Sequence, residues 1–168
     1  MAVKPRMRGV VHEYAFFVAL AAGAGLLVAA PTAKARLAAA IYVAGLAGLL
    51  GTSALYHRVT WRKPNVRRWL RRLDHSMIFV LVAGTYTPFA LLVLAPALGW
   101  AVLGVVWGGA LAGVVISLLW IDAPRWLTAA LYVVLGWVSI VIMPQLWDRA
   151  GVLAVALLAT GGVLYTVG

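Results

Sequence analysis

Long apolar runs, one after another, are the feature that most limits the folds open to this chain. The runs lie at 14–30, 37–56, 77–94, 100–121, 126–146 and 151–168. A helix rises about 1.5 Å per residue, so about 20 apolar residues cross a hydrocarbon core of about 30 Å. The runs are apolar on every face, whereas the strands of a membrane β-barrel alternate over about 10 residues. The sequence therefore predicts an all-α, polytopic bundle of transmembrane helices that forms a single integral membrane domain over 1–168.

The composition excludes the soluble classes of protein. Hydrophobic residues make up 65% of the chain and charged residues 11%, against about 45–50% and about 25% in ordinary globular domains. A soluble domain of 168 residues has too little interior to bury so much apolar surface, which excludes a soluble enzyme or DNA-binding protein. Disorder is excluded because disordered chains are poor in apolar residues. The chain has no cysteine, which excludes disulfides and thiolate metal ligands.

Basic residues are distributed unevenly between the two sides of the predicted bundle. Alternate loops place eleven on one side: Lys4, Arg6, Arg8, Arg58, Arg62, Lys63, Arg67, Arg68, Arg71, Arg72 and Arg125. The other side has three: Lys34, Arg36 and Arg149. Short loops rich in Lys and Arg stay on the cytoplasmic side of a membrane. The count therefore predicts a cytoplasmic N-terminus and a cytoplasmic loop at 58–72.

The first 35 residues also have features of a secretory signal peptide. Residues 4–8 are basic, and the segment 33–35 (AKA) has the small-x-small form of a cleavage site. However, the apolar run at 14–30 is longer than the usual signal core, and Glu13 stands directly before it. We therefore expect a first span that is retained.

The basic segment 58–72 raises the question of nucleic-acid binding, because clustered arginines hold phosphates. Predicted spans flank this segment directly on both sides, and the anionic surface of a cytoplasmic leaflet attracts such clusters. We interpret the segment as a lipid-facing loop. The expected partners are membrane lipids, and no nucleic acid is expected.

A few polar residues interrupt the apolar pattern near the cytoplasmic ends of the first three helices. Ser53 and His57 are four residues apart and therefore share one helical face. Asp74 precedes the third run, and the short connection makes the second and third helices antiparallel neighbours, which brings His57 and Asp74 to a similar depth. This pairing suits a metal ligand and a carboxylate that holds a ligand or its water. The structural alternative is that both residues only complement the dipoles of the helix ends.

Small residues recur in the run 100–121. Its glycines at 104, 108, 109 and 113 allow a neighbouring helix to approach closely. We interpret this pattern as packing rather than chemistry.

Three motifs in order resemble a known family. They are the segments 53–58 (SALYHR), 73–75 (LDH) and 83–89 (AGTYTPF). Together they resemble the bacterial hemolysin III family, which belongs to the progestin and adipoQ receptor (PAQR) superfamily of seven-helix membrane proteins. The resemblance covers the six runs of an expected seven. It implies a multi-pass protein of a bacterial plasma (inner) membrane.

The resemblance also implies a zinc site near the cytoplasmic surface. In the family pattern, a histidine of the second helix and two histidines of the last helix bind the metal, and an aspartate of the third helix acts through water. By this resemblance, His57 is a zinc ligand, Asp74 holds the water, and Ser53 is its polar neighbour. Glu13 is similar to the acidic residue at the start of the family's first helix.

The chain departs from the family pattern after its third helix. His75 is the last histidine of the sequence, so the pair of the last helix is missing. We expect the gene to continue beyond Gly168 for about 40–60 residues, one loop and one span, and to encode that pair. One histidine and one carboxylate fall short of four zinc ligands, so the chain by itself is expected to bind zinc weakly or not at all. His75, turned about 100° from Asp74, and His12 are expected outside the site.

Two classes of function fit these features. The first is a zinc-dependent intramembrane hydrolase of a lipid amide, in which His57 holds the metal, Asp74 orients its water and Ser53 steadies that water or the substrate oxyanion. The second is a non-enzymatic protein, either a receptor-like or membrane-homeostasis regulator with structural zinc or a pore-forming cytolysin. A pore needs polar stripes along several spans, and the last three runs carry few polar residues. The sequence carries no signal for the substrate or the oligomeric state.

Overall fold

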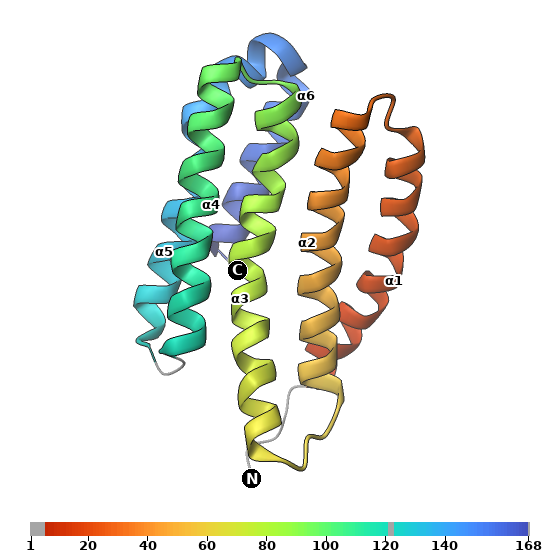
Figure 1. The fold of residues 1–168 in the computed structure, drawn as a ribbon, viewed down its shortest axis with the longest axis vertical. Helices are drawn as coiled ribbons and strands as arrows, with labels where there is room; N and C mark the ends of the chain where they lie inside the picture. The colour runs from red at the N-terminus through yellow and green to blue at the C-terminus, as the bar shows by residue number, and fades with distance from the viewer. Residues whose placement is uncertain (1–5, 121–122, 168) are drawn as a thin grey trace.

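The computed structural model describes residues 6–120 and 123–167, and within these ranges the chain is all-helical (Figure 1). The helices are α1 (Arg6–Ala29), α2 (Ala33–Arg58), α3 (Pro64–Leu92), α4 (Pro96–Leu119), α5 (Arg125–Trp137) and α6 (Ser139–Val167). Five stretches of the described chain are long and apolar enough to cross a membrane, the last of them being Trp126–Val167. The predicted all-α membrane bundle is confirmed.

The helices begin where the local sequence favours a first turn. The hydroxyl of Thr32 accepts a hydrogen bond of 3.1 Å from the amide of Ala35 and caps α2. Pro64 and Pro96 open α3 and α4, where a missing amide hydrogen is tolerated. Because arginine is a good helix former, α3 starts at Pro64 and extends well before the apolar run at 77–94. This extension carries much of the basic segment on the helix rather than in the loop.

The chain turns back on itself at Gly151, inside the segment assigned to α6 (Figure 1). Gly151 has a φ of 83° and a ψ of 173°, a conformation that a residue without Cβ adopts readily. This position lies between the fifth and sixth apolar runs of the sequence. The helices are also interrupted once before it, at Val138 between α5 and α6, which the hydropathy pattern does not indicate.

The backbones of α2 and α3 approach each other closely at two glycines. A methyl group added at Gly45 would lie 3.4 Å from the Cα of Leu81, and one added at Gly84 would lie 3.4 Å from the carbonyl oxygen of Ile41. Small residues at such crossings let membrane helices pack without long side chains between them. Ser53 and His57 of α2 and Asp74 of α3 therefore lie on two tightly packed neighbours.

The expected packing role of the α4 glycines is only half right. A methyl group at Gly113 would overlap the ring of Phe79, which is buried in the core that α3 shares with α4, α5 and α6. Gly109 also packs against a neighbouring helix, whereas Gly104 and Gly108 have nothing within 4 Å of such a methyl group. Within the described chain these two glycines have no such packing role, because they lie on another face of α4 than Gly113.

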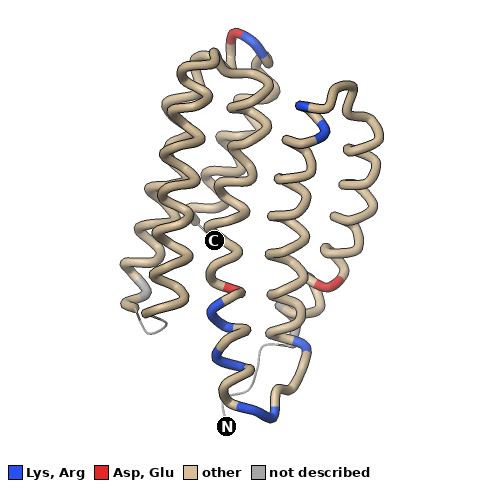
Figure 2. Tube along the Cα trace, viewed as in Figure 1, with Lys and Arg blue, Asp and Glu red and all other residues tan. Residues whose placement is uncertain are grey.

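The described charges gather at the two ends of the bundle (Figure 2). One end, called the basic end below, carries Arg58, Arg62, Lys63, Arg67, Arg68, Arg71 and Arg72. The opposite end carries Lys34, Arg36, Asp148 and Arg149. Of the other basic residues counted above, Lys4 lies outside the described residues, and the side chains of Arg6, Arg8 and Arg125 lie outside the described side chains. The unequal basic charge of the two ends agrees with the loop count, while the orientation in the membrane stays a prediction.

Large apolar side chains cover the outer surface between these two ends. Val28 is 86% exposed and Leu119 is 79% exposed, and many other leucines, valines and tryptophans face outward. Monomeric soluble proteins rarely expose apolar patches of this extent. The outer surface therefore suits the hydrocarbon of a bilayer.

Candidate functional site

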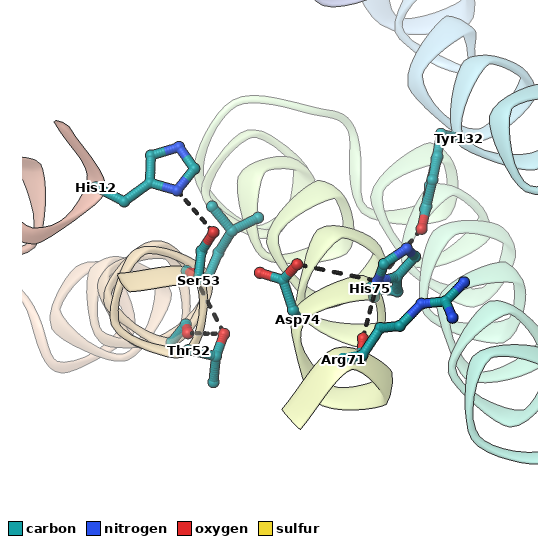
Figure 3. A network of polar contacts seen from close by, with 9 residues as sticks. His12, Thr52, Ser53, Arg71, Asp74, His75 and Tyr132 are labelled. Atoms are coloured by element: carbon teal, nitrogen blue, oxygen red, sulfur yellow. Dashed lines mark hydrogen bonds and ion pairs between the residues drawn. The ribbon is translucent and has the colours of Figure 1, made fainter. Parts of the chain in front are cut away.

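Polar side chains of α1 and α2 meet near the basic end. The Nδ1 atom of His12 lies 2.7 Å from the Oγ atom of Ser53, at hydrogen-bond distance (Figure 3). Ser53 is only 4% exposed, so its hydroxyl is withdrawn from both water and lipid. A buried hydroxyl without a partner is costly, and His12 supplies that partner from the neighbouring helix.

His57 lies one turn beyond Ser53, where α1 approaches α2 closely. A methyl group added at Gly9 would lie 2.9 Å from the Cβ of His57, so a side chain at Gly9 would push the two helices apart. The His57 ring stands edge-on to the Tyr56 ring, with 4.8 Å between the centroids. Ser53 and His57 therefore both lie beside α1, as their spacing of four residues predicts.

Glu13 forms a salt bridge across the same pair of helices. Its Oε2 atom lies 2.6 Å from the Nε atom of Arg58, which is in the last turn of α2. Both side chains are partly exposed, so the pair contributes only modestly to stability. In this structure Glu13 links α1 to α2.

Asp74 lies on α3, and in Figure 3 its carboxylate points toward α2. Its side chain is 16% exposed, and its Oδ2 atom lies 3.9 Å from the Nδ1 atom of His75. That Nδ1 atom is closer to the carbonyl oxygen of Arg71, at 2.8 Å. Because a carbonyl oxygen only accepts hydrogen bonds, the Nδ1 atom of His75 carries a hydrogen and donates a hydrogen bond to this oxygen. The Nδ1 atom of His75 is thus bonded within its own helix. The ring nevertheless lies nearer to the Asp74 carboxylate than the 100° rotation between consecutive helical residues suggests.

One protein family matches the whole chain. The family model described as "Haemolysin-III related" covers residues 1–168. The chain belongs to the haemolysin III family. Hemolysin-3 of Bacillus cereus is 34% identical over 137 residues, which are 82% of this chain and 62% of that protein. The Hemolysin-3 homolog of Bacillus subtilis (strain 168) is 38% identical over 117 residues, which are 70% of this chain and 54% of that protein.

The match confirms the family that the motifs suggest. With its helical fold and apolar outer surface, this haemolysin III chain is a multi-pass membrane protein. The matched parts make up less than two thirds of the two relatives. The activity and the partners of the whole protein are therefore treated below as proposals.

The donor set of the described residues is too small for zinc. No group of three or more His, Asp or Glu among the described residues lies close enough to hold a metal ion. His57 and Asp74 offer one nitrogen and one carboxylate, whereas zinc in proteins takes four ligands. The described residues alone do not fit a zinc ion, and any such site needs ligands from outside them.

Two contributors to this region were missed from sequence. His12 was placed outside the site, yet it bonds Ser53, because spacing within one helix does not report contacts between helices. Tyr132 of α5 donates a hydrogen bond of 3.2 Å to the carbonyl oxygen of His75, and its ring packs on Phe79 at 4.4 Å between centroids. The small residue Gly9, one turn before His12, is the signal that points to a close α1–α2 contact.

Proposed function

We propose that this haemolysin III chain supplies one part of a zinc site at the basic end of α1, α2 and α3. In this proposal His57 contributes a nitrogen ligand, Asp74 holds a water, and Ser53 is their polar neighbour. The remaining ligands come from residues outside the described ones. The single observation that carries the proposal is the near-burial of the Asp74 carboxylate, whose side chain is 16% exposed. Such ionisable groups in membrane bundles usually mark functional sites.

The activity that we propose for the complete protein is hydrolysis of a lipid amide. The apolar outer surface lets a lipid reach the helices from the bilayer. In this proposal Asp74, whose carboxylate is directed toward α2 (Figure 3), accepts a proton from the attacking water. In this proposal Ser53 exchanges its bond to His12 for one to the water or to a polar atom of the substrate. We propose a plasma-membrane location with the basic end in the cytoplasm, because basic clusters favour that side.

A non-enzymatic regulator with a structural metal is the second candidate. The observation that favours it is that two of the nearby histidines already form hydrogen bonds within the bundle. His12 bonds Ser53, and the Nδ1 atom of His75 bonds the carbonyl of Arg71. Such contacts hold helices together without any need for turnover.

The test compares two carboxylates of the same chain in the full-length gene product. The protein is reconstituted in phosphatidylcholine nanodiscs with zinc and an N-acyl lipid that carries a fluorescent acyl chain. Fatty-acid release is expected from the wild type and from Asp148→Ala, whose carboxylate lies at the opposite end. Release should fall at least tenfold in Asp74→Ala. Zinc retained in the wild type without any release would favour the regulator, and equal release from both variants would refute the role of Asp74.

A further inference from the structure

The basic end contains a cavity of about 850 Å³ whose wall is rich in arginine. It is separate from the His12–Ser53 contact and opens between α3, the segment after α2 and the start of α5. The wall residues that matter here are Tyr56, Trp61, Arg62, Arg67, Arg68 and Arg71. A volume of this size suits a ligand larger than a single inorganic ion.

The arginines converge on the cavity because of helix periodicity. Pro64, Arg67, Arg68, Arg71 and His75 all line it, and their spacings of three, four, seven and eleven residues keep them on one face of α3. The segment after α2 adds Trp61 and Arg62 from one side, and Ala123 and Thr128 complete the wall near α5. A stripe on one helix is thus turned into a concave surface.

The charged side chains that line the cavity, among the described residues, are all basic. Four arginines line the cavity, and none of the described residues that line it is acidic. Glu13 pairs with Arg58, which does not line the cavity, and the Asp74 carboxylate lies 3.9 Å from the ring of His75, which does. Guanidinium groups that face a common space repel one another, and an anion in that space converts the repulsion into attraction.

The level of the cavity in the bilayer follows from its aromatic neighbours. Trp61 and Tyr56 line it. Trp69, in the same part of α3, is exposed, and the guanidinium of Arg72 lies 5.0 Å from its ring. Tryptophan and tyrosine gather at the depth of lipid head groups. We therefore expect the arginines at the depth of the phosphates of a membrane surface.

We propose that this cavity binds the phosphate groups of an anionic ligand, with the head group of a two-phosphate phospholipid as the source that its depth and volume favour. Arginine forms paired, planar hydrogen bonds to phosphate oxygens, which lysine does not. Basic pockets between helices on the cytoplasmic side recognise head groups of this kind. A soluble phosphate compound offers the same chemistry, and the experiment separates the two sources. The proposal does not depend on the zinc site.

The experiment measures ligands retained by the full-length protein in a neutral detergent by native mass spectrometry. The probes are cardiolipin, phosphatidylcholine and inorganic pyrophosphate. The pocket variant is Arg67→Gln/Arg68→Gln. Its matched control is Lys63→Gln/Arg72→Gln, which removes two positive charges from the same end, at residues that do not line the cavity. Arg67→Lys/Arg68→Lys keeps the charge and serves as the variant closest to the wild-type fold.

Cardiolipin is expected to bind the wild type at least tenfold more tightly than phosphatidylcholine. Arg67→Gln/Arg68→Gln should lose at least tenfold of that affinity, Arg67→Lys/Arg68→Lys several-fold, and the control variant less than twofold. Tight binding of pyrophosphate that is lost in the same pocket variant supports a soluble phosphate compound as the source. Equal losses in the pocket and control variants would mean general charge attraction and would overturn the proposal. The proposal would also be overturned if the wild type bound neither cardiolipin nor pyrophosphate more tightly than phosphatidylcholine.

Discussion

The imidazole of His12 and the hydroxyl of Ser53 lie 2.7 Å apart and join α1 to α2 across 41 residues of sequence. Glu13, the next residue of α1, forms a salt bridge to Arg58 of α2, so two polar links hold the same helix pair near the basic end. Ser53 is buried, whereas the salt bridge is partly exposed. The His12–Ser53 contact is therefore expected to fix the position of α1 more strongly than the salt bridge does.

Removing the Ser53 hydroxyl should loosen this helix pair. We expect Ser53→Ala to lower the free energy of unfolding by about 0.5–1.5 kcal/mol, the range of hydrogen bonds between membrane helices. The matched control is Thr52→Ala, because the Thr52 hydroxyl bonds only carbonyls of its own helix, at 2.7 and 3.2 Å. Reversible unfolding in mixed micelles provides the measurement.

A double-mutant cycle with His12→Ala isolates the contact itself. If His12 and Ser53 interact, the loss in the double variant should be smaller than the sum of the two single losses. Strict additivity would show that the contact contributes no stability.

The glycines of α4 allow a second prediction on packing. Gly113→Ala should destabilise the protein by about 1–3 kcal/mol, because the added methyl group overlaps the buried ring of Phe79. Gly104→Ala adds the same group on the same helix, where nothing lies within 4 Å. It should be neutral or stabilise the helix by up to about 1 kcal/mol. The same unfolding assay would contradict this account if both variants lost equal stability.

Much of the fold can be predicted from the sequence because a bilayer admits few alternatives. Runs of about 20 apolar residues must form helices that satisfy their own backbone, and this is what α1 to α4 do. The extension of α3 back to Pro64 was not visible in the hydropathy, since arginines lower hydropathy without breaking a helix. The break at Val138 was also not visible in the hydropathy, because it lies within an unbroken apolar run.

Only part of the candidate site could be predicted from the sequence. The shared face of Ser53 and His57 follows from helix periodicity within α2. The His12–Ser53 bond depends on the register between two helices, which a single sequence does not encode in any periodic form. The same limit applies to Tyr132, which reaches the His75 carbonyl from 57 residues away.

The orientation of the bundle gives a third prediction. The chain has no cysteine, so a single introduced cysteine reports its own side of the membrane. Arg67→Cys at the basic end should react with a membrane-impermeant maleimide only after the cells are opened, because basic loops stay in the cytoplasm. Arg36→Cys at the opposite end should react in intact cells. Labelling of Arg67→Cys from outside would reverse the proposed orientation.

The last prediction concerns zinc in the full-length protein, measured by elemental analysis of purified variants. His57→Ala should abolish stoichiometric zinc, because it removes a direct nitrogen ligand of the proposed site. Asp74→Ala should leave much of the metal bound under excess zinc, since loss of a partner outside the direct ligands costs about 10–100-fold in affinity.

His75→Ala is the matched control for both zinc variants. Its Nδ1 atom bonds the carbonyl of Arg71, so its loss should leave the zinc content unchanged. The order expected is therefore wild type equal to His75→Ala, then Asp74→Ala, then His57→Ala with none. Equal zinc in the wild type and in His57→Ala would end the ligand assignment. His57 would then be a residue that packs beside Gly9 and complements the C-terminal dipole of α2.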